Sequence, residues 1–270
     1  MSEKQTIEQT IIPITKQRLI QDLAFLKIDQ APVLTHIALS KVGWISGGAV
    51  TMIQALLESI KDQGTLVMPT QSGDNSDPAL WENPPVPAAW IQTLYETMPA
   101  YDKRYTPTRN MGRTAELFRT YPNVLRSDHP LVSFAAIGKD AETIINAHVL
   151  TPMFGEQTPL DVLYKMHAKI LLVGTDFDVC TALHYSEYLA KICPVIHHRC
   201  AMIESGERRW VTFKDFEYDS EDFAALGRDF EKTHTIIETT IGQAHAKLID
   251  MKTLIDFGVE WLLKNRKNKE

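Results

Sequence analysis

The chain has 270 residues, of which 44% are hydrophobic and 23% are charged, a composition typical of a globular protein with a large core. Its formal net charge of −6 argues against a nucleic-acid partner and suits a cationic substrate. The N-terminal segment lacks a signal-peptide pattern, no apolar run reaches membrane-spanning length, and three cysteines make no disulfide framework. We therefore expect a cytoplasmic protein that has no membrane partner.

Apolar periodicity and turn residues predict alternating helices and strands in the first half of the chain. In the segment 14–27, the apolar residues have the spacing of one helix face, formed by Leu19, Ile20, Leu23 and Leu26. The stretch 71–87 is polar and rich in Pro and Asp, so it predicts a long loop of the kind that often carries function. The other elements expected here are a strand over 33–37, a helix over 49–60, a strand over 64–69 and helices over 88–98 and 112–119.

The second half of the chain continues this alternation. Apolar and β-branched runs flank Glu204-Ser205-Gly206-Glu207 and predict a hairpin of 195–203 and 208–213. Strands alternating with helices favour one three-layer α/β/α domain over residues 1–270, and the hairpin suggests a mixed sheet. We expect flexible tails at 1–13 and 265–270. The other expected elements are strands over 133–137 and 170–174, helices over 139–145, 159–167 and 223–232, a β-branched segment over 235–241, and a helix with an early break over 244–264.

The stretch from Ile170 to Glu187 is the one around which the chain is organised. An apolar run that ends at Gly174 predicts a buried strand, and Thr181 is placed to serve as the N-cap of a following helix. His184 lies one turn into that helix, and Glu187 lies three residues further along the same face. Enzymes of the α/β class often present a base in this way, and the carboxylate can orient the imidazole or help to bind a cation. The spacing fits a surface histidine beside a glutamate as well.

Two loops have the residue types of an anion site. His36 to Gly48 reads as a strand, a glycine-containing loop and a helix, and the N-terminus of a helix suits phosphate, although the glycine spacing matches neither a dinucleotide fingerprint nor a P-loop. In the second loop, Arg126-Ser127-Asp128-His129-Pro130, an arginine, a hydroxyl and a histidine can meet a phosphate or a carbonyl. A local ion pair between Arg126 and Asp128 explains the second loop equally well.

Two further groups of residues have alternative explanations. The segment Cys193 to Cys200 contains sulfur and imidazole at short range, but His197 and His198 point to opposite faces of a strand and no CxxC is present, so a strand without metal is favoured over a zinc site. Acidic residues recur in two regions, where they form either a site for a polycation or a solvated face. They are Asp74, Asp77, Glu204, Glu207, Asp215, Glu217, Asp219, Glu221 and Asp222.

The chain resembles the aminoglycoside N(3)-acetyltransferase family, the antibiotic acetyltransferases, from about Lys16 to Lys264. The resemblance rests on many short stretches that occur in the same order, each too short to be specific alone. They are His36 to Gly48, Gly64 to Gln71, Asp77-Pro78 with Trp81, Tyr105 to Thr108, Met111-Gly112, Glu116 to Arg119, Arg126 to Pro130, Ser133 to Ala136, Gly155 to Leu160, Thr181 to Glu187 and Asp256 to Gly258.

This resemblance implies an acetyl-CoA-dependent N-acetyltransferase with a three-layer α/β fold unrelated to the GNAT fold. The expected acceptor is an aminoglycoside-like amine, acetylated at its 3-N position by a monomer or homodimer without a metal. The family's general base falls on His184. The chemistry adds Glu187, or another carboxylate that the sequence does not place, to orient the ring, and Thr181 or a loop amide as the oxyanion donor. The expected contacts to acetyl-CoA are His36, Ile37, Ala38, Leu39, Ser40, Lys41, Val42, Gly43, Thr108 and Ser127. The expected contacts to the amine substrate are Asp74, Asp77, Glu187 and Glu221.

One departure from the family pattern bears on the coenzyme. Family members usually carry two serines directly after the histidine of the coenzyme loop, where this chain has Ile37 and Ala38. Two hydroxyl donors are therefore absent, but backbone donors remain, so we expect coenzyme binding to persist. The alternative is a CoA-binding homologue with a non-aminoglycoside acceptor or little catalysis, and a weaker third hypothesis is a zinc hydrolase built on Cys193 to Cys200.

Overall fold

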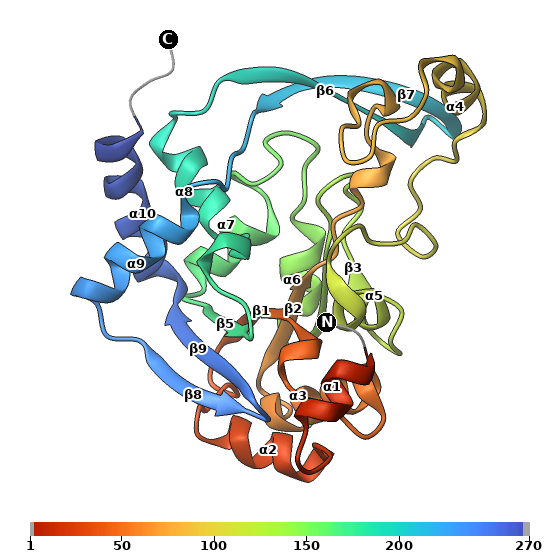
Figure 1. Ribbon diagram of the computed structural model, residues 1–270. Helices are drawn as coiled ribbons and strands as arrows, with labels where there is room; N and C mark the ends of the chain where they lie inside the picture. Colours follow the sequence, from red (N-terminus) through yellow and green to blue (C-terminus); the bar gives the residue numbers. More distant parts are fainter. Residues whose placement is uncertain (1–2, 267–270) are drawn as a thin grey trace.

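The computed structural model describes residues 3–266 and shows a central sheet between two layers of helices (Figure 1). The helices are α1 (Glu3–Gln9), α2 (Lys16–Ala24), α3 (Gly48–Ile60), α4 (Ile91–Thr97), α5 (Gly112–Phe118), α6 (Ala141–Asn146), α7 (Pro159–Lys165), α8 (Leu183–Ala190), α9 (Phe223–Thr233) and α10 (Met251–Asn265). The strands are β1 (Pro32–Ile37), β2 (Thr65–Pro69), β3 (Leu125–Arg126), β4 (Phe134–Gly138), β5 (Lys169–Val173), β6 (Val195–Glu204), β7 (Glu207–Phe216), β8 (Ile237–Ile241) and β9 (Ala244–Asp250). Within residues 3–266, no helix combines the length and apolarity needed to cross a bilayer.

Seven strands form one mixed sheet in the order β3-β4-β2-β1-β5-β9-β8. The central strand β1 runs parallel to both of its neighbours, β2 and β5. Strands β4 and β9 run antiparallel to β2 and β5, so the sheet is mixed on both sides of its parallel centre. The carboxyl ends of β1, β2 and β5 therefore meet at one edge of the sheet. After β1 the chain continues toward β2 on one side, and after β5 it continues toward β8 and β9 on the other.

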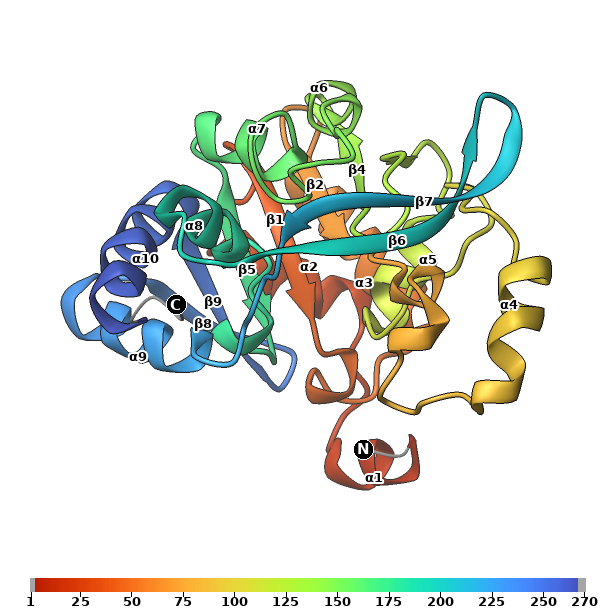
Figure 2. The same ribbon diagram turned by 90° about the horizontal axis from the view of Figure 1, so that it is seen from above.

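The strand sequences explain the three layers, because successive side chains in a strand point to opposite faces. Leu34, Ile170 and Leu172 face a core cluster shared with helices α6 to α10. Val33, Leu171 and Val173 face a second cluster, which they share with α2, α3 and α5. Both faces of the sheet are thus apolar and both are covered, as Figure 2 shows from above. The expected α/β fold with a mixed sheet is confirmed.

The predicted hairpin is present as β6 and β7, but it is not part of the main sheet. It forms a separate two-stranded sheet that crosses the top of the molecule in Figure 1, from α8 toward α4. At its far end, Trp210 Nε1 donates a hydrogen bond of 2.8 Å to the carbonyl oxygen of Tyr95 in α4. The sheet is mixed as expected, but the hairpin is not the cause. The antiparallel strands β4 and β9 make the sheet mixed.

The expected helix over 244–264 is two elements, strand β9 and helix α10. Ala246 and Leu248 face one core cluster while Ile249 faces the other, which is the period of two typical of a strand. Asp250 then caps the helix, because its carboxylate accepts a hydrogen bond of 2.9 Å from the amide of Thr253. The short strand β3 was also missed, because two residues are too few for a periodic pattern.

Both expected tails contain ordered contacts in the described residues. Helix α1 lies within 1–13, and the Thr10 hydroxyl beyond it accepts a hydrogen bond of 2.8 Å from the amide of Trp44. At the other end, Arg266 pairs with Asp222 and Glu187. The rest of the expected C-terminal tail, 267–270, lies outside the described residues.

Helices α8 and α10 approach closely at Gly258. A Cβ atom at this position would lie 2.6 Å from Oγ and 3.0 Å from Cβ of Ser186. The Ser186 hydroxyl donates a hydrogen bond of 3.1 Å to the carbonyl oxygen of Ile255, which joins the two helices further. The missing side chain at Gly258 thus sets the distance between α10 and the helix that carries His184 and Glu187.

We predict that Gly258→Ala destabilises the protein by about 1–2 kcal/mol, because overpacking costs ~1–3 kcal/mol and alanine returns only ~1 kcal/mol of helix propensity. The melting temperature and urea midpoint measure this change. Gly73→Ala is the matched control, since its Cβ would meet only the Arg109 side chain, with Cγ at 3.8 Å and Cβ at 3.9 Å. A Gly258→Ala protein as stable as the wild type would show that α8 and α10 have room to separate.

Candidate active site

A cavity of about 290 Å³ opens at the carboxyl ends of β1, β2 and β5. In open α/β sheets, ligands bind beyond the carboxyl ends of adjacent parallel strands from which the chain leaves in opposite directions, as it does here after β1 and β5. A hollow of about 400 Å³ beside Tyr101 and Asp128 is larger, but no residue from these strand ends lines it. The lining of the strand-end cavity is Thr35, His36, Ile37, Ala38, Met68, Pro69, Asn110, Met111, Gly112, Thr114, Ala115, Thr175, Val179 and Thr181.

The loop after β1 begins with a single 3₁₀ turn, Leu39–Lys41. The amides of Ala38, Lys41 and Val42 donate hydrogen bonds to carbonyl oxygens within the protein. The amides of Leu39 and Ser40 have no such partner in the part of the chain that the structure describes. The exposed Lys41 side chain has no ion pair there either, so the loop presents two amides and one cation.

His184 is held by hydrogen bonding on one side and by aromatic rings around it. Its Nδ1 lies 2.6 Å from Glu187 Oε2, and a carboxylate oxygen can only accept, so Nδ1 carries the proton. Its ring stacks on Phe154 at 4.8 Å between centroids, with Tyr218 at 5.6 Å and Phe223 at 5.1 Å. The structure gives Nε2 no partner among the described residues. His184 is therefore a fixed imidazole with one free nitrogen.

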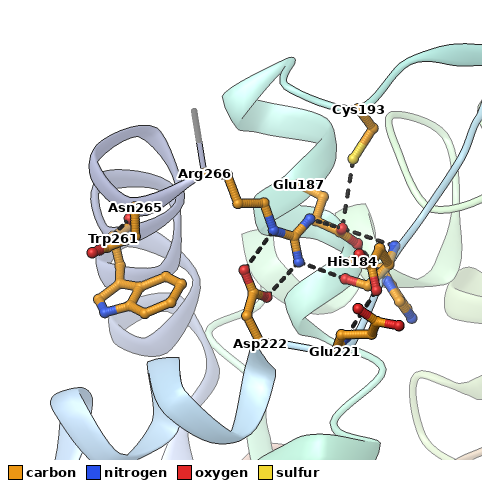
Figure 3. Close-up of polar contacts among 9 residues, drawn as sticks. His184, Glu187, Cys193, Glu221, Asp222, Trp261, Asn265 and Arg266 are labelled. Atoms are coloured by element: carbon orange, nitrogen blue, oxygen red, sulfur yellow. Dashed lines mark hydrogen bonds and ion pairs between the residues drawn. The ribbon is translucent and has the colours of Figure 1, made fainter. Parts of the chain in front are cut away.

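The Glu187 carboxylate is fully buried, and protein groups occupy both of its oxygens (Figure 3). Oε1 accepts a hydrogen bond from the Arg266 guanidinium and another of 3.0 Å from the amide of Asp219, while the Cys193 thiol lies 3.5 Å away. Oε2 accepts from His184 alone. The prediction that Glu187 orients His184 agrees with this geometry. Its suggested role as a substrate contact does not, because the carboxylate is fully buried behind His184, Arg266 and the amide of Asp219.

His36 lines the cavity at the end of β1. Burial, with a smaller contribution from the charge of His184, lowers the pKa of His36 to about 4, so this ring is neutral near pH 7. Its buried Nε2 has no partner in the described residues. His184 is not itself among the lining residues, but it follows Thr181, which lines the cavity, and its amide donates to the Thr181 carbonyl oxygen at 3.2 Å.

Thr181 is not the N-cap of α8, so that prediction was wrong. The cap position is Ala182, without a side-chain hydrogen bond. The first amides of the helix donate instead to carbonyl oxygens three residues back, as the amide of His184 does to Thr181 at 3.2 Å. The Thr181 hydroxyl is thereby released from capping and lies in the cavity lining, nearly buried and without a partner among residues 3–266.

Two of the expected coenzyme contacts are used inside the protein. Ser127 is buried, and its hydroxyl accepts from the amide of Phe134 at 2.9 Å and contacts His148 Nδ1 at 2.8 Å. The Val42 side chain is buried in the core, and its amide and carbonyl both have backbone partners. Thr108 remains a prediction: its amide donates to Glu116, and it borders a depression that shares Asn110, Met111 and Gly112 with the cavity.

The loop from Arg126 to Pro130 is structural. Arg126 donates to Thr70 O, Thr106 O and Ser133 Oγ, and it has no ion pair with Asp128. His129 Nδ1 accepts from the amides of Leu131 and Val132, and burial lowers the pKa of His129 to about 4. The ion pair between Arg126 and Asp128 is therefore not formed, because polar groups of Arg126 and His129 already hold neighbouring loops, while the anion site stays a prediction.

The acidic residues separate into three places. Glu204 and Glu207 pair with Arg209 at the hairpin turn. Asp74 pairs with Arg109 at 3.2 Å, and Asp77 accepts a hydrogen bond of 2.5 Å from the Tyr95 hydroxyl. Asp219, Glu221 and Asp222 lie beside Glu187, and of these Glu221 is exposed and has no ion pair in the described part (Figure 3). Glu221 is thus the carboxylate best placed to meet a substrate cation.

The cysteines and histidines around β6 have separate partners. Cys193 contacts Glu187, Cys200 is buried in the core, and His198 Nε2 lies 3.2 Å from the carbonyl oxygen of Phe216. Among the residues that the structure describes, no group of three or more His, Cys, Asp or Glu side chains is arranged to hold a metal ion.

Sequence reasoning missed three residues that shape this site: Arg266, Phe154 and Tyr218. Arg266 sits in a charged C-terminal run where nothing distinguishes it from its neighbours. Phe154 and Tyr218 lie in loops, where no periodic pattern marks an inward-facing ring. Only the folded chain brings these loops to α8.

Comparison with known proteins finds relatives that match over nearly the whole chain. The profile of the family aminoglycoside 3-N-acetyltransferase matches residues 34–263. The chain is 42% identical over 264 residues to the SPbeta prophage-derived aminoglycoside N(3')-acetyltransferase-like protein YokD of Bacillus subtilis (strain 168), with 97% of both chains covered. The crystal structure of YokD matches with a TM-score of 0.94 over 97% of this chain and 98% of that chain.

Two further relatives carry more specific names. Aminoglycoside N(3)-acetyltransferase VII of Streptomyces paromomycinus is 31% identical, over 97% of this chain and 96% of that protein. The structure described as AAC-IIIb binary with CoASH is 28% identical with a TM-score of 0.82, and the match covers 96% and 99% of the two chains. Because the family profile spans most of the chain and relatives above 30% identity match at nearly full length, this chain belongs to the aminoglycoside 3-N-acetyltransferase family of enzymes.

Proposed function

We propose that this protein transfers an acetyl group from acetyl-CoA directly to an amine of an aminoglycoside-like cation, at the 3-N position. The observation that supports this most is the state of His184, which has Nδ1 bound to buried Glu187 and Nε2 without a partner in the described residues, just after cavity-lining Thr181. The aminoglycoside and CoASH in the names of its relatives support the two substrates.

In this reaction the amine nitrogen bonds to the acetyl carbon, the C–S bond breaks, and CoA leaves as a thiolate. The amine attacks only when neutral, so His184 Nε2 takes a proton from the nitrogen and later returns it to the sulfur. Glu187 holds the ring and stabilises the imidazolium while it lasts. An acyl-enzyme is unnecessary, and Cys193 suits that role poorly because burial and nearby Glu187 raise the pKa of its thiol to about 12.

Thr181 is the proposed donor to the oxyanion of the tetrahedral intermediate. Its hydroxyl lines the cavity without a protein partner among residues 3–266, so it can donate to an oxygen that becomes negative during transfer. The same absence of a partner means that donation breaks no existing hydrogen bond.

The loop after β1 is the proposed site of the CoA pyrophosphate. The free amides of Leu39 and Ser40 and the ammonium of Lys41 supply two donors and a cation. Gly43 is buried against Gln243 and Thr10, so it shapes the loop rather than meeting the coenzyme. One acetyltransferase domain is proposed for the whole chain, and three free thiols support a reducing cytoplasm as its location.

We predict that His184→Ala lowers kcat by ~10²–10⁴-fold, the usual contribution of a positioned base, while CoA affinity stays nearly constant. Steady-state release of CoA thiol with an aminoglycoside acceptor measures kcat, and circular dichroism confirms folding. Glu187→Gln has a smaller effect, since an amide still orients the ring. A folded His184→Ala protein with the wild-type kcat would refute the base assignment and direct attention to His36.

We predict that CoA binds in calorimetry and that Lys41→Ala weakens this binding ~5-fold, as expected for the loss of about 1 kcal/mol from a charged contact. Lys61→Ala is the control, because Lys61 is also exposed but pairs with Asp29 at 2.6 Å. No heat of CoA binding at millimolar concentration would count against the acetyltransferase itself. If both variants bound CoA with equal affinity, Lys41 would not be a coenzyme contact, but the rest of the proposed site would stand.

We predict that Glu221→Gln raises the KM of a cationic acceptor ~1.5- to 5-fold, since an exposed charge pair contributes ~0.2–1 kcal/mol. The wild-type KM also rises with salt, because exposed charges are screened over about 8–10 Å. Glu204→Gln, at the hairpin turn, is the control and leaves KM unchanged. A salt-independent KM, or equal effects of both variants, would contradict an acidic acceptor site at Glu221.

A further inference from the structure

We propose that Arg266, the residue that follows α10, is a positioning residue for this reaction: through Glu187 it keeps the proton of neutral His184 on Nδ1 and the lone pair on Nε2. This inference rests on the proposed function, because it concerns the nitrogen that receives the amine proton. Arg266 lies in a segment that the sequence marks only as a charged tail.

The guanidinium of Arg266 joins three elements that meet behind His184. Its Nε donates to Asp222 Oδ2 at 2.7 Å, and its Nη2 donates to Asp222 Oδ1 and to the carbonyl oxygen of Asp219, both at 2.5 Å. Its Nη1 donates to Glu187 Oε1, as Figure 3 shows. The backbone amide of Arg266 donates to Leu262 O at 2.9 Å, which holds the residue at the end of α10.

Charge makes the contact with Glu187 more than a structural one. The Glu187 side chain is fully buried and that of Arg266 is 18% exposed, so water does little to stabilise either charge. Burial works against the charged form of Arg266, but hydrogen bonds to Asp222 and Glu187 outweigh it and hold its pKa above the ordinary value. A lasting cation thus faces the one oxygen of Glu187 that His184 does not use.

The charge of Glu187 decides where the proton of His184 sits. An anionic Oε2 only accepts, so the ring must present N–H at Nδ1 and its lone pair at Nε2. Without the guanidinium, burial favours the neutral acid, because an uncompensated charge is costly in the interior. A protonated Oε2 can donate to Nδ1, and the proton of the neutral ring then moves to Nε2, where it blocks acceptance of the amine proton.

The other titratable groups near the pair are His36, Cys193, Tyr218, Asp219 and Asp222. The pKa of His36 is lowered to about 4, the pKa of Cys193 is raised to about 12, and burial raises the pKa of Tyr218. None of these three changes its charge near neutral pH. The two aspartates lie on the Arg266 side of Glu187, where Asp222 pairs with the guanidinium.

The experiment compares Arg266→Gln, Arg266→Lys and the wild type by ¹H–¹⁵N correlation spectra of ¹⁵N-histidine protein, with His184→Ala used for assignment. In the wild type at alkaline pH, we expect His184 to show protonated Nδ1 and bare Nε2. In Arg266→Gln, we expect protonated Nε2 and a kcat lower by ~10²-fold, within the range that a positioned base contributes. Arg266→Lys keeps the charge and restores the wild-type tautomer. Arg209→Gln, at the hairpin turn, is the matched control and changes neither.

A second comparison separates the effect of the Arg266 charge from the effect of its packing. It uses the Glu187→Gln background, in which the loss of Arg266 leaves no unpaired buried carboxylate. In the Glu187→Gln background, the proposal expects Arg266→Gln to cause little further loss of kcat, because the charge that Arg266 stabilises is gone. An equal loss in both backgrounds would overturn the proposal, and so would a folded Arg266→Gln protein with the wild-type tautomer. If the wild type acetylates no amine, the proposed function fails, while the tautomer spectra still decide the role of Arg266.

Discussion

The buried carboxylate of Glu187 is the group on which the arrangement of the site depends. One of its oxygens fixes the His184 ring, and the other is held by Arg266 and by the amide of Asp219. A charge in the interior persists only with such partners, so α8, the loop before α9 and the end of α10 must meet at this point. The close approach of α8 and α10 at Gly258 serves the same end, because a longer distance would separate Arg266 from Glu187.

The sheet supplies the second constraint. The chain continues toward β2 after β1 and toward β8 and β9 after the neighbouring β5. The loops after β1 and β5 therefore part, and a cavity opens at this edge of the sheet. The lining includes His36, Ile37 and Ala38 at the end of β1, and Thr175, Val179 and Thr181 after β5. Ile37 and Ala38 have no hydroxyl groups, so hydroxyl donors in this cavity come from other lining residues, namely Thr35, Thr114, Thr175 and Thr181.

The hairpin and the acidic residues outside the sheet have mainly structural roles. The hairpin β6–β7 reaches from α8 to α4 and holds α4 through Trp210, and its turn places Glu204 and Glu207 against Arg209. Many of the acidic residues are thus paired with cations or hold the structure. Of those placed above, only Glu221 is exposed and without an ion pair near His184 and Glu187. Net charge alone is a poor guide to a substrate site, because the same residue type serves as cap, ion-pair partner and ligand.

The sequence by itself determined the alternation of strands and helices, the strand before His184, the spacing of His184 and Glu187, and the family, because these depend on local periodicity and short ordered motifs. It misread Ala244 to Asp250 as helical, since a seven-residue strand next to a helix leaves little room to tell a period of two from 3.6. Only the tertiary structure decided that Ser127 is used inside the protein, that Thr181 is free of capping, and that Arg266 reaches Glu187. The physical reason is that the sequence shows which polar residue is present but not what it contacts. Its partner can be solvent, backbone or a charge 79 residues away, and only the packing of the folded chain determines which.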